Sequence, residues 1–158
     1  MSRCDPGQGA PALCPSAEPA MTGSVAFGVV GGTASEPRVR HLARPVPVSA
    51  ELLELAHPVR PTEVFRFAAP CACNACPNFQ DSHCSLATRI VKWLPAVVDS
   101  LPVCSIRPRC RWWRDEGKAA CLRCPQVVTD NYQPSDQMRQ TCAPVECVDG
   151  DLNRSLGQ

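Results

Sequence analysis

The chain has 158 residues, with 16 Lys and Arg against 15 Asp and Glu. Its length fits one domain, and its near-neutral charge excludes the general attraction that draws basic proteins to nucleic acids or anionic membranes. No apolar run reaches the ~18 residues that a transmembrane helix needs. Pro and Gly interrupt residues 1–20 where a signal peptide would have its apolar core, so we expect a cytoplasmic protein without a membrane segment.

Composition divides the chain into three regions. We expect residues 1–22 to be a disordered N-terminal extension, because Ala, Pro, Gly and Ser dominate them without any period. Met21 lies within this stretch and is an alternative start of the protein. Residues 24–132 are predicted to form one cysteine-rich, metal-binding domain, and residues 133–158 a polar, flexible tail.

Short strands and helices are expected before the cysteine-rich stretch. Apolar and alternating runs predict the strands, and prolines predict the linker between them. Ser49 is a typical N-cap and predicts the start of a short helix. The expected elements are a strand over 25–30 that ends at Gly31 and Gly32, an extended linker over 36–48, a helix over 50–56 and a strand over 64–67.

The clearest helical pattern lies between Cys84 and Cys104. Apolar residues recur there at steps of three or four, which predicts a helix with one apolar face. Pro95 interrupts the pattern, so the helix either kinks at this point or consists of two short helices. The apolar positions are Leu86, Ile90, Leu94, Val97 and Leu101; a shorter helix, weakened by Gly117, is predicted over 111–120 and a last strand over 127–128.

Eight of the twelve cysteines have the spacing C-x-C-x2-C-x7-C-x19-C-x5-C-x10-C-x2-C. A straight helix between Cys84 and Cys104 would hold them ~30 Å apart, which would place them in different sites. Two sites of four ligands are the simplest division; ligands mixed between the sites are the alternative if the chain folds back at Pro95. The first predicted site is Cys71, Cys73, Cys76 and Cys84, and the second is Cys104, Cys110, Cys121 and Cys124.

The other four cysteines are predicted not to be ligands. Cys4 and Cys14 lie in the stretch expected to be disordered, while Cys142 and Cys147 lie in the polar tail without cysteine neighbours at a useful spacing. We interpret the last two as free thiols. A disulfide scaffold is an alternative for the whole set, but the reducing cytosol favours metal binding.

Three features favour iron–sulfur clusters. The run from Cys71 to Cys76 holds three thiolates, which can bind different irons of one cubane, whereas one zinc ion usually takes two ligands from such a turn. Pro follows Cys76 and Cys124, which resembles the Cys-Pro ending of ligand runs in bacterial ferredoxins, although the full ferredoxin run is absent. Six basic residues between 104 and 124 would stabilise an anionic cluster. We therefore predict two cysteine-ligated [4Fe–4S] clusters.

Zinc is the alternative cofactor. The pairs Cys73-x2-Cys76 and Cys121-x2-Cys124 resemble zinc knuckles and could form one Cys4 site. Their separation exceeds the gap that makes such a motif specific. The other four cysteines would also need a second zinc ion.

No catalytic residue is predicted, because no nucleophile elbow, zinc-protease motif or Walker loop is present. We expect a small, irregular α+β, metal-stapled single domain, with one longer helix between two four-cysteine groups, that transfers single electrons to or from a partner enzyme. Alternatives are a zinc-stapled interaction module and an iron–sulfur redox- or gas-sensing regulator.

Nucleic-acid contact is a weaker interpretation of the basic stretch between residues 104 and 124. The redox partner is expected to dock near Arg107, Arg109, Arg111 and Arg114.

Overall fold

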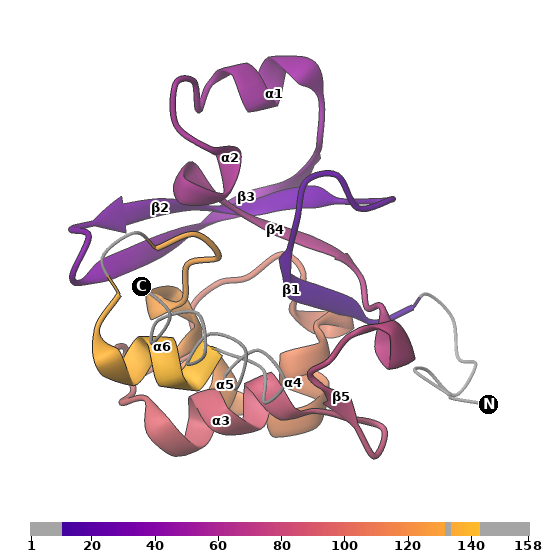
Figure 1. Cartoon of the computed structure of the whole chain (residues 1–158), viewed down its shortest axis with the longest axis vertical. Helices are drawn as coiled ribbons and strands as arrows, with labels where there is room; N and C mark the ends of the chain where they lie inside the picture. Colours follow the sequence, from indigo (N-terminus) through magenta and orange to yellow (C-terminus); the bar gives the residue numbers. More distant parts are fainter. Residues whose placement is uncertain (1–10, 132–133, 143–158) are drawn as a thin grey trace, which may run out of the picture.

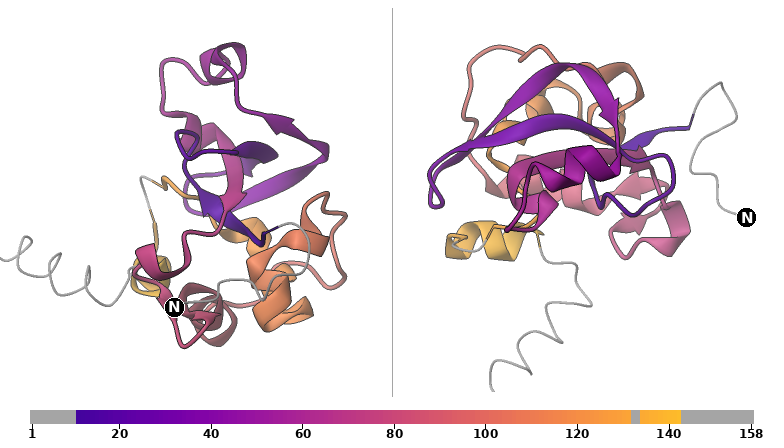
Figure 2. Two further views of the ribbon diagram at one scale, coloured as in Figure 1. Left: turned by 90° about the vertical axis from the view of Figure 1, so that its right-hand side faces the viewer. Right: turned by 90° about the horizontal axis from the view of Figure 1, so that it is seen from above.

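A computed structural model describes residues 11–131 and 134–142. They form a small mixed α+β fold, in which a four-stranded antiparallel sheet separates two short helices from a larger helical layer (Figures 1 and 2). The strands are β1 (Leu13–Ala17), β2 (Val25–Gly32), β3 (Pro37–Pro47) and β4 (Phe65–Pro70), with a small hairpin of β5 (Phe79–Gln80) and β6 (His83–Cys84). The helices are α1 (Ala50–Glu54), α2 (Pro61–Val64), α3 (Ser85–Trp93), α4 (Arg111–Glu116), α5 (Lys118–Cys121) and α6 (Asp136–Cys142), with the 3₁₀ turns η1 (Cys73–Ala75), η2 (Arg107–Arg109) and η3 (Cys124–Gln126).

Strand β4 lies inside the sheet, whose order is β1-β4-β2-β3. Successive side chains of a strand point to opposite faces, so β4 contributes to two cores. Phe65 and Phe67 pack on the face covered by α1, while Ala68 packs on the face covered by α3 and α4. The same alternation directs the intervening Arg66 into the helical layer, where it is completely buried.

Strand β3 corrects the prediction of an extended linker over 36–48. The segment is extended, but it pairs with β2 from Gly32↔Pro37 to Val25↔Pro47. Three prolines did not prevent pairing because β3 is an edge strand, where a proline is tolerated without a ladder hydrogen bond. The strand over 25–30 and the helix that begins after Ser49 are confirmed.

The long helix predicted between Cys84 and Cys104 is wrong in length. Helix α3 ends at Trp93, two residues before Pro95, because a proline disfavours helical backbone in the residue before it. Residues 94–103 continue as irregular chain along the helical layer. The apolar periodicity correctly indicated a buried face up to Leu94, but beyond Pro95 it did not reflect a helix.

Gly117 divides the second predicted helix into α4 and α5. Its φ of 68° and ψ of −148° lie in a region that is essentially restricted to glycine. The N–H group of Gly117 still donates to the carbonyl of Trp113 (2.9 Å), which closes the last turn of α4. The chain then turns sharply, so that α5 packs against α4 rather than extending it (Figure 1).

Both ends of the described chain carry structure that was not expected. Residues 13–17 are not disordered, because they form β1 and pair with β4; residues 1–10 lie outside the described part. Helix α6 lies in the predicted tail and packs beside α3 through Met138. Val127 and Val128 are buried in irregular chain rather than in a strand. No helix formed by the described residues is long and apolar enough to cross a membrane.

Candidate functional site

Nine cysteines of the described residues form no disulfide bond, whereas Cys73 does form one. Each of the nine thiols lines one of two cavities on the helical side of the sheet. Cysteine group 1 lines the first cavity and consists of Cys14, Cys71, Cys76 and Cys84. Cysteine group 2 lines the second cavity and consists of Cys104, Cys110, Cys121 and Cys124.

Sheet pairing assembles group 1 from distant parts of the sequence. Cys14 lies on β1, which pairs with β4, and the N–H group of Cys71 donates to the carbonyl of Ala12 (2.9 Å) just after β4 ends. The chain then turns through η1 and the β5–β6 hairpin and reaches Cys84, the N-cap residue of α3. The cavity between these segments has a volume of about 270 Å³.

Cys142 also lines this cavity but stands apart from group 1. The four group 1 thiols influence one another electrostatically, whereas the charges that act on Cys142 are those of Arg89 and Arg66. Burial raises the pKa of Cys142, and these two arginines oppose that rise. We therefore count four thiols as one group and Cys142 as a neighbour.

One continuous segment supplies group 2. Cys110 is the N-cap of α4, the turn at Gly117 reverses the chain, Cys121 ends α5 and Cys124 begins η3. Cys104 joins them from the chain before η2. The cavity among these residues is narrow, about 20 Å³, and its lining is almost wholly apolar. It has about the space of one water molecule.

The cavity of group 2 is smaller than a four-iron cluster with its four sulfides, so binding such a cluster would require the cavity walls to move apart. Two buried donors of the cavity lining, Trp112 Nε1 and Arg107 Nε, have no hydrogen-bond partner within the described part of the chain. Sulfur acceptors of a cluster would satisfy such orphaned N–H groups.

Burial favours the protonated form of five thiols of the two groups in the metal-free protein. It raises the pKa of Cys110 and of Cys14 to about 12 and the pKa of Cys84 to about 11, and it also raises the pKa of Cys104 and Cys121. Backbone N–H groups at the start of α3 and α4 act in the opposite direction. Metal binding must therefore release protons, and these same N–H groups are placed to stabilise the thiolates.

Each group has its own arginine. Arg107 lines the group 2 cavity, lies over the ring of Trp113 (5.6 Å) and lowers the pKa of Cys121 against the effect of burial. Arg111 lines the group 1 cavity, lies over the ring of Phe79 (5.3 Å) and is buried. Each cavity therefore has an arginine in its lining.

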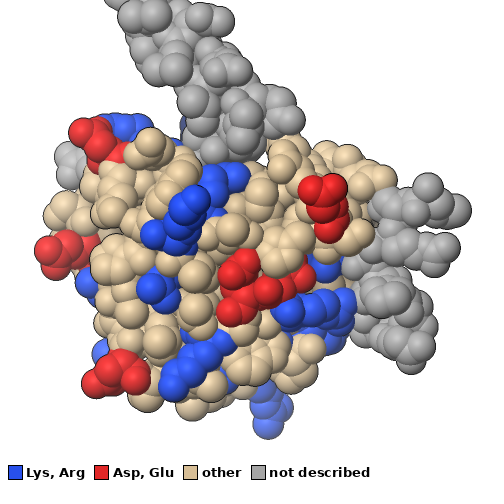
Figure 3. Space-filling view, turned by 90° about the horizontal axis from the view of Figure 1, so that it is seen from below, with Lys and Arg blue, Asp and Glu red and all other residues tan. Residues whose placement is uncertain are grey.

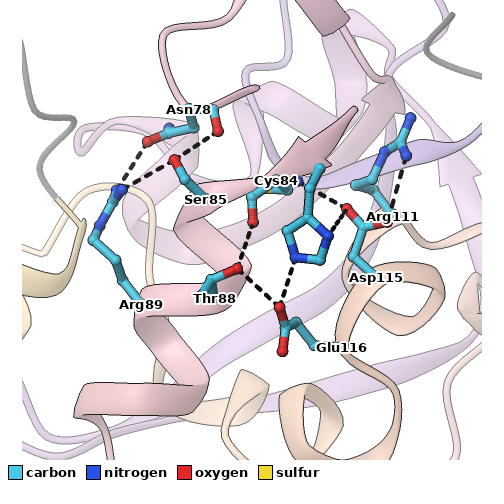
Figure 4. A network of polar contacts seen from close by, with 9 residues as sticks. Asn78, Cys84, Ser85, Thr88, Arg89, Arg111, Asp115 and Glu116 are labelled. Atoms are coloured by element: carbon cyan, nitrogen blue, oxygen red, sulfur yellow. Dashed lines mark hydrogen bonds and ion pairs between the residues drawn. The ribbon is translucent and has the colours of Figure 1, made fainter. Parts of the chain in front are cut away.

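A carboxylate holds the backbone of Cys84 in place (Figure 4). Asp115 Oδ2 accepts a hydrogen bond from the N–H group of Cys84 (2.9 Å), and Asp115 Oδ1 pairs with Arg111 (3.5 Å). Asp115 belongs to α4 and Cys84 to the start of α3, so the contact fixes these two helices relative to one another. The sequence offered no signal for this contact beyond a pair of acids in a basic stretch.

The other side of the same network holds His83 away from the cysteines. His83 Nε2 and Glu116 Oε2 are 2.6 Å apart. Thr88 Oγ1 donates to the same carboxylate oxygen (2.8 Å) (Figure 4). His83 does not belong to the lining of the group 1 cavity. Its role is to tie the β5–β6 hairpin to α4.

The structure brings together three of the four residues predicted for the first site. A sulfur that forms a disulfide bond cannot bind metal as a thiolate, so Cys73 cannot supply one in this structure. Cys14, which we had excluded, lines the cavity with the other three. The remaining three predicted residues of the first site lie together, as do all four of the second.

Burial also corrects the predicted docking surface. Arg111 is buried against Asp115 and cannot meet a partner, whereas Arg109 and Arg114 are exposed and Arg107 is partly exposed. On the face shown in Figure 3, acidic and basic side chains are interspersed.

His41 is a residue of the group 2 cavity that sequence analysis did not single out. It lies on β3 opposite Gly28 of β2 and stacks on Phe27, with ring centroids 5.8 Å apart. Burial lowers its pKa to about 4, and the charges of Arg66 and Arg107 add to the shift. The imidazole is therefore neutral beside the thiols at pH 7. Because β3 was expected to be a linker, nothing in the sequence placed His41 there.

No three His, Cys, Asp or Glu side chains of the described residues come close enough together to hold a single metal ion. Comparison with family models finds no match, and neither does comparison with curated proteins or with solved structures. The arrangement of the thiols is therefore the basis for a functional proposal.

Proposed function

We propose that this protein carries two iron–sulfur clusters, each held by four thiolates, and that it transfers single electrons to or from a partner enzyme. The observation that supports the proposal is the gathering of nine thiols around two cavities, the four of group 1 with Cys142 at the first and the four of group 2 at the second. The ligand set proposed is Cys14, Cys71, Cys76 and Cys84 for the first cluster and Cys104, Cys110, Cys121 and Cys124 for the second.

Geometry favours clusters over single zinc ions. Four sulfurs at about 2.3 Å from one zinc would lie about 3.8 Å from one another, and no group of three ligands among the described residues suits one ion. The thiols of each group instead surround a cavity. A four-iron cluster needs this arrangement, because each thiolate binds a different iron.

A bound four-iron cluster supplies a reversible one-electron couple. The protein's own residues would hold and tune it. Phe27 and Trp112 keep water from group 2, Arg107 and Arg111 offset negative charge, and backbone N–H groups at the start of α3 and α4 face the sulfurs. Apolar walls, N–H donors and cations of this kind set the reduction potential of such a cluster.

An acidic redox partner fits the exposed side of this region. Arg109 and Arg114 flank the turn and helix that carry Cys110, and both are exposed. Complementary charge would orient the partner and speed its association. This proposed surface is smaller than the one predicted from the sequence, since Arg111 no longer belongs to it.

Anaerobic purification followed by visible absorption and by iron, sulfide and zinc analysis tests the proposal. We expect a brown protein with about eight irons and eight sulfides per chain, as two four-iron clusters require. A colourless protein with stoichiometric zinc, or with no metal, would overturn it and leave a zinc-stapled interaction module or a thiol protein. Clusters that are destroyed by one oxidation, rather than cycling, would favour the regulator instead.

A further inference from the structure

Arg66 is a buried cation with an unusual set of partners. It lies on β4, its exposed fraction is 0%, and it makes four hydrogen bonds. Nε and NH2 donate to the carbonyl of Pro15 (3.1 and 2.8 Å), and NH1 donates to the carbonyls of Cys124 and Val127 (both 2.9 Å). All three acceptors are neutral backbone groups.

These acceptors lie beside the two cysteine groups. Pro15 and Cys124 line the group 2 cavity and Val127 lines the group 1 cavity, while Pro15 also directly follows Cys14 of group 1. One guanidinium thus connects the backbone of both groups. Strand β1 makes a second connection to group 2, because Leu13 forms a β-bridge with Cys110.

The charge of Arg66 is not balanced by a carboxylate in the described part of the chain, whose ion pairs involve other residues. The guanidinium lies instead between two aromatic rings, 5.0 Å from the centroid of Phe27 and 5.5 Å from that of Trp112. Trp112 lines both cavities. Burying a charge is costly unless a compensating charge is near, and a bound anion would supply that charge.

We propose that Arg66 is the shared counter-charge of both cysteine sites. Stacked on Trp112, it forms the wall between the two sites, across which the charge of each site acts on the other. This inference rests on the proposed iron–sulfur function. A four-thiolate cluster is anionic and becomes more negative when it is reduced. A fixed cation beside it therefore stabilises the reduced form and raises its potential. Because Arg66 lies between the two sites, its removal should lower both potentials together.

The reach of its charge supports this position. Burial is the main cause of the lowered pKa of His41, which lines the group 2 cavity, and the positive charge of Arg66 lowers it further. It also opposes the burial that raises the pKa of Cys142, which lines the group 1 cavity. Arg66 therefore acts electrostatically on one lining residue of each cavity, His41 in the second and Cys142 in the first.

Two other arginines provide matched controls, each confined to one group. Arg107 lines the group 2 cavity and acts on Cys121. Arg89 donates to Ser85 (3.2 Å) and Asn78 (2.8 Å) beside group 1, where it interacts electrostatically with Cys84. Neither arginine is a predicted ligand.

The experiment is an anaerobic redox titration of the full chain, with cluster content measured in parallel. The variants R66Q and R66M remove the charge with two different side chains, and R66K keeps it. C14S, which retains only the second proposed cluster, assigns the two potentials. We expect R66Q and R66M to lower both potentials, each by about tenfold in the equilibrium constant or ~59 mV for one electron. R66K should keep both close to those of the unaltered protein. R107Q should lower only the group 2 potential, and R89Q only the group 1 potential.

Each outcome bears on the inference. Unchanged potentials in R66Q or R66M, or a change at only one site, would overturn it. If both neutral variants lose iron from both sites while R66K stays loaded, the shared charge is supported through cluster retention; loss from one site only, or equal loss in R66K, would overturn it. An unaltered protein that contains no iron and sulfide would instead refute the proposed function itself.

Discussion

The two cysteine groups differ in how they are built and in how open they are. Group 1 draws Cys14 from β1 and the rest from the chain after β4, around a cavity of about 270 Å³. Group 2 comes from one segment and surrounds about 20 Å³ of almost wholly apolar space. Four thiols thus surround a large cavity in group 1 and a small cavity in group 2. Volume and polarity, rather than ligand type, should give the two sites different reactivity.

The ligand set of group 1 gives the largest expected effect. C14S should reduce the iron content from about eight to about four per chain, because one of four cluster ligands is lost. C73S is the matched control and should keep about eight, since Cys73 is already in a disulfide bond. Iron and sulfide analysis of both variants decides the assignment. Full loading of C14S together with loss in C73S would restore the set predicted from the sequence.

In air, the two proposed clusters should lose their iron at different rates. C110S, which retains only the proposed group 1 cluster, should lose its iron about tenfold faster than C14S, which retains only that of group 2, because the apolar walls of group 2 limit access. Visible absorption in aerated buffer follows the loss. Equal rates, or faster loss from group 2, would contradict the comparison of the two cavities.

Alkaline pH should destabilise the reduced, metal-free protein through both groups. Burial raises the pKa of Cys84 to about 11 and that of Cys110 to about 12, from 9.0. Between pH 9 and these values the folded form holds protons that the unfolded form releases, so the free energy of unfolding falls as the pH rises. Each thiol should account for about 1 kcal/mol by pH 10. Urea titrations at pH 7.5 and pH 10 measure the fall.

Serine substitutions divide this pH dependence between the groups. C84S and C110S should each remove about 1 kcal/mol of the loss at pH 10. A double variant should remove about the sum, because the two thiols line different cavities. A slope that neither substitution changes would show that these thiols are not held in their protonated form.

The turn at Gly117 should affect metal loading of group 2 alone. G117A should cost about 1–3 kcal/mol of unfolding free energy, because the backbone there is in a region that only glycine adopts readily. A methyl group at this position meets nothing within 4 Å, so the cost is purely conformational. Urea titration with iron analysis should show weaker loading of group 2 and unchanged loading of group 1. A119G in the neighbouring helix α5 is a control for general loss of helix stability.

Sequence reasoning succeeded where the signal was local. The strand that ends at Gly31 and Gly32, the N-cap at Ser49 and the weak point at Gly117 each depend on the conformational preferences of one or two residues. The four cysteines grouped together as the second site also line one cavity, which follows from their closeness along the chain, while their role as ligands stays a prediction.

It failed where long-range pairing decided the outcome. Cys14 sits in a Pro-rich stretch with no period, and only the ladder with β4 gives that stretch a structure. His41 reaches the group 2 cavity for the same reason, through the pairing of β3 with β2. The periodicity across Pro95 misled in the opposite direction, since apolar spacing alone does not show that a helix continues past a proline.

The pairing of β1 with β4 has a consequence for the order in which the two groups form and take up metal. Group 2 needs only a local segment to bring its thiols together, so it can take up metal before the sheet is complete. Group 1 needs the long-range contact between β1 and the end of β4, which forms late because closing a long loop costs entropy before it gains contacts. Occupancy of the first site would then report a finished fold, and occupancy of the second only a finished segment.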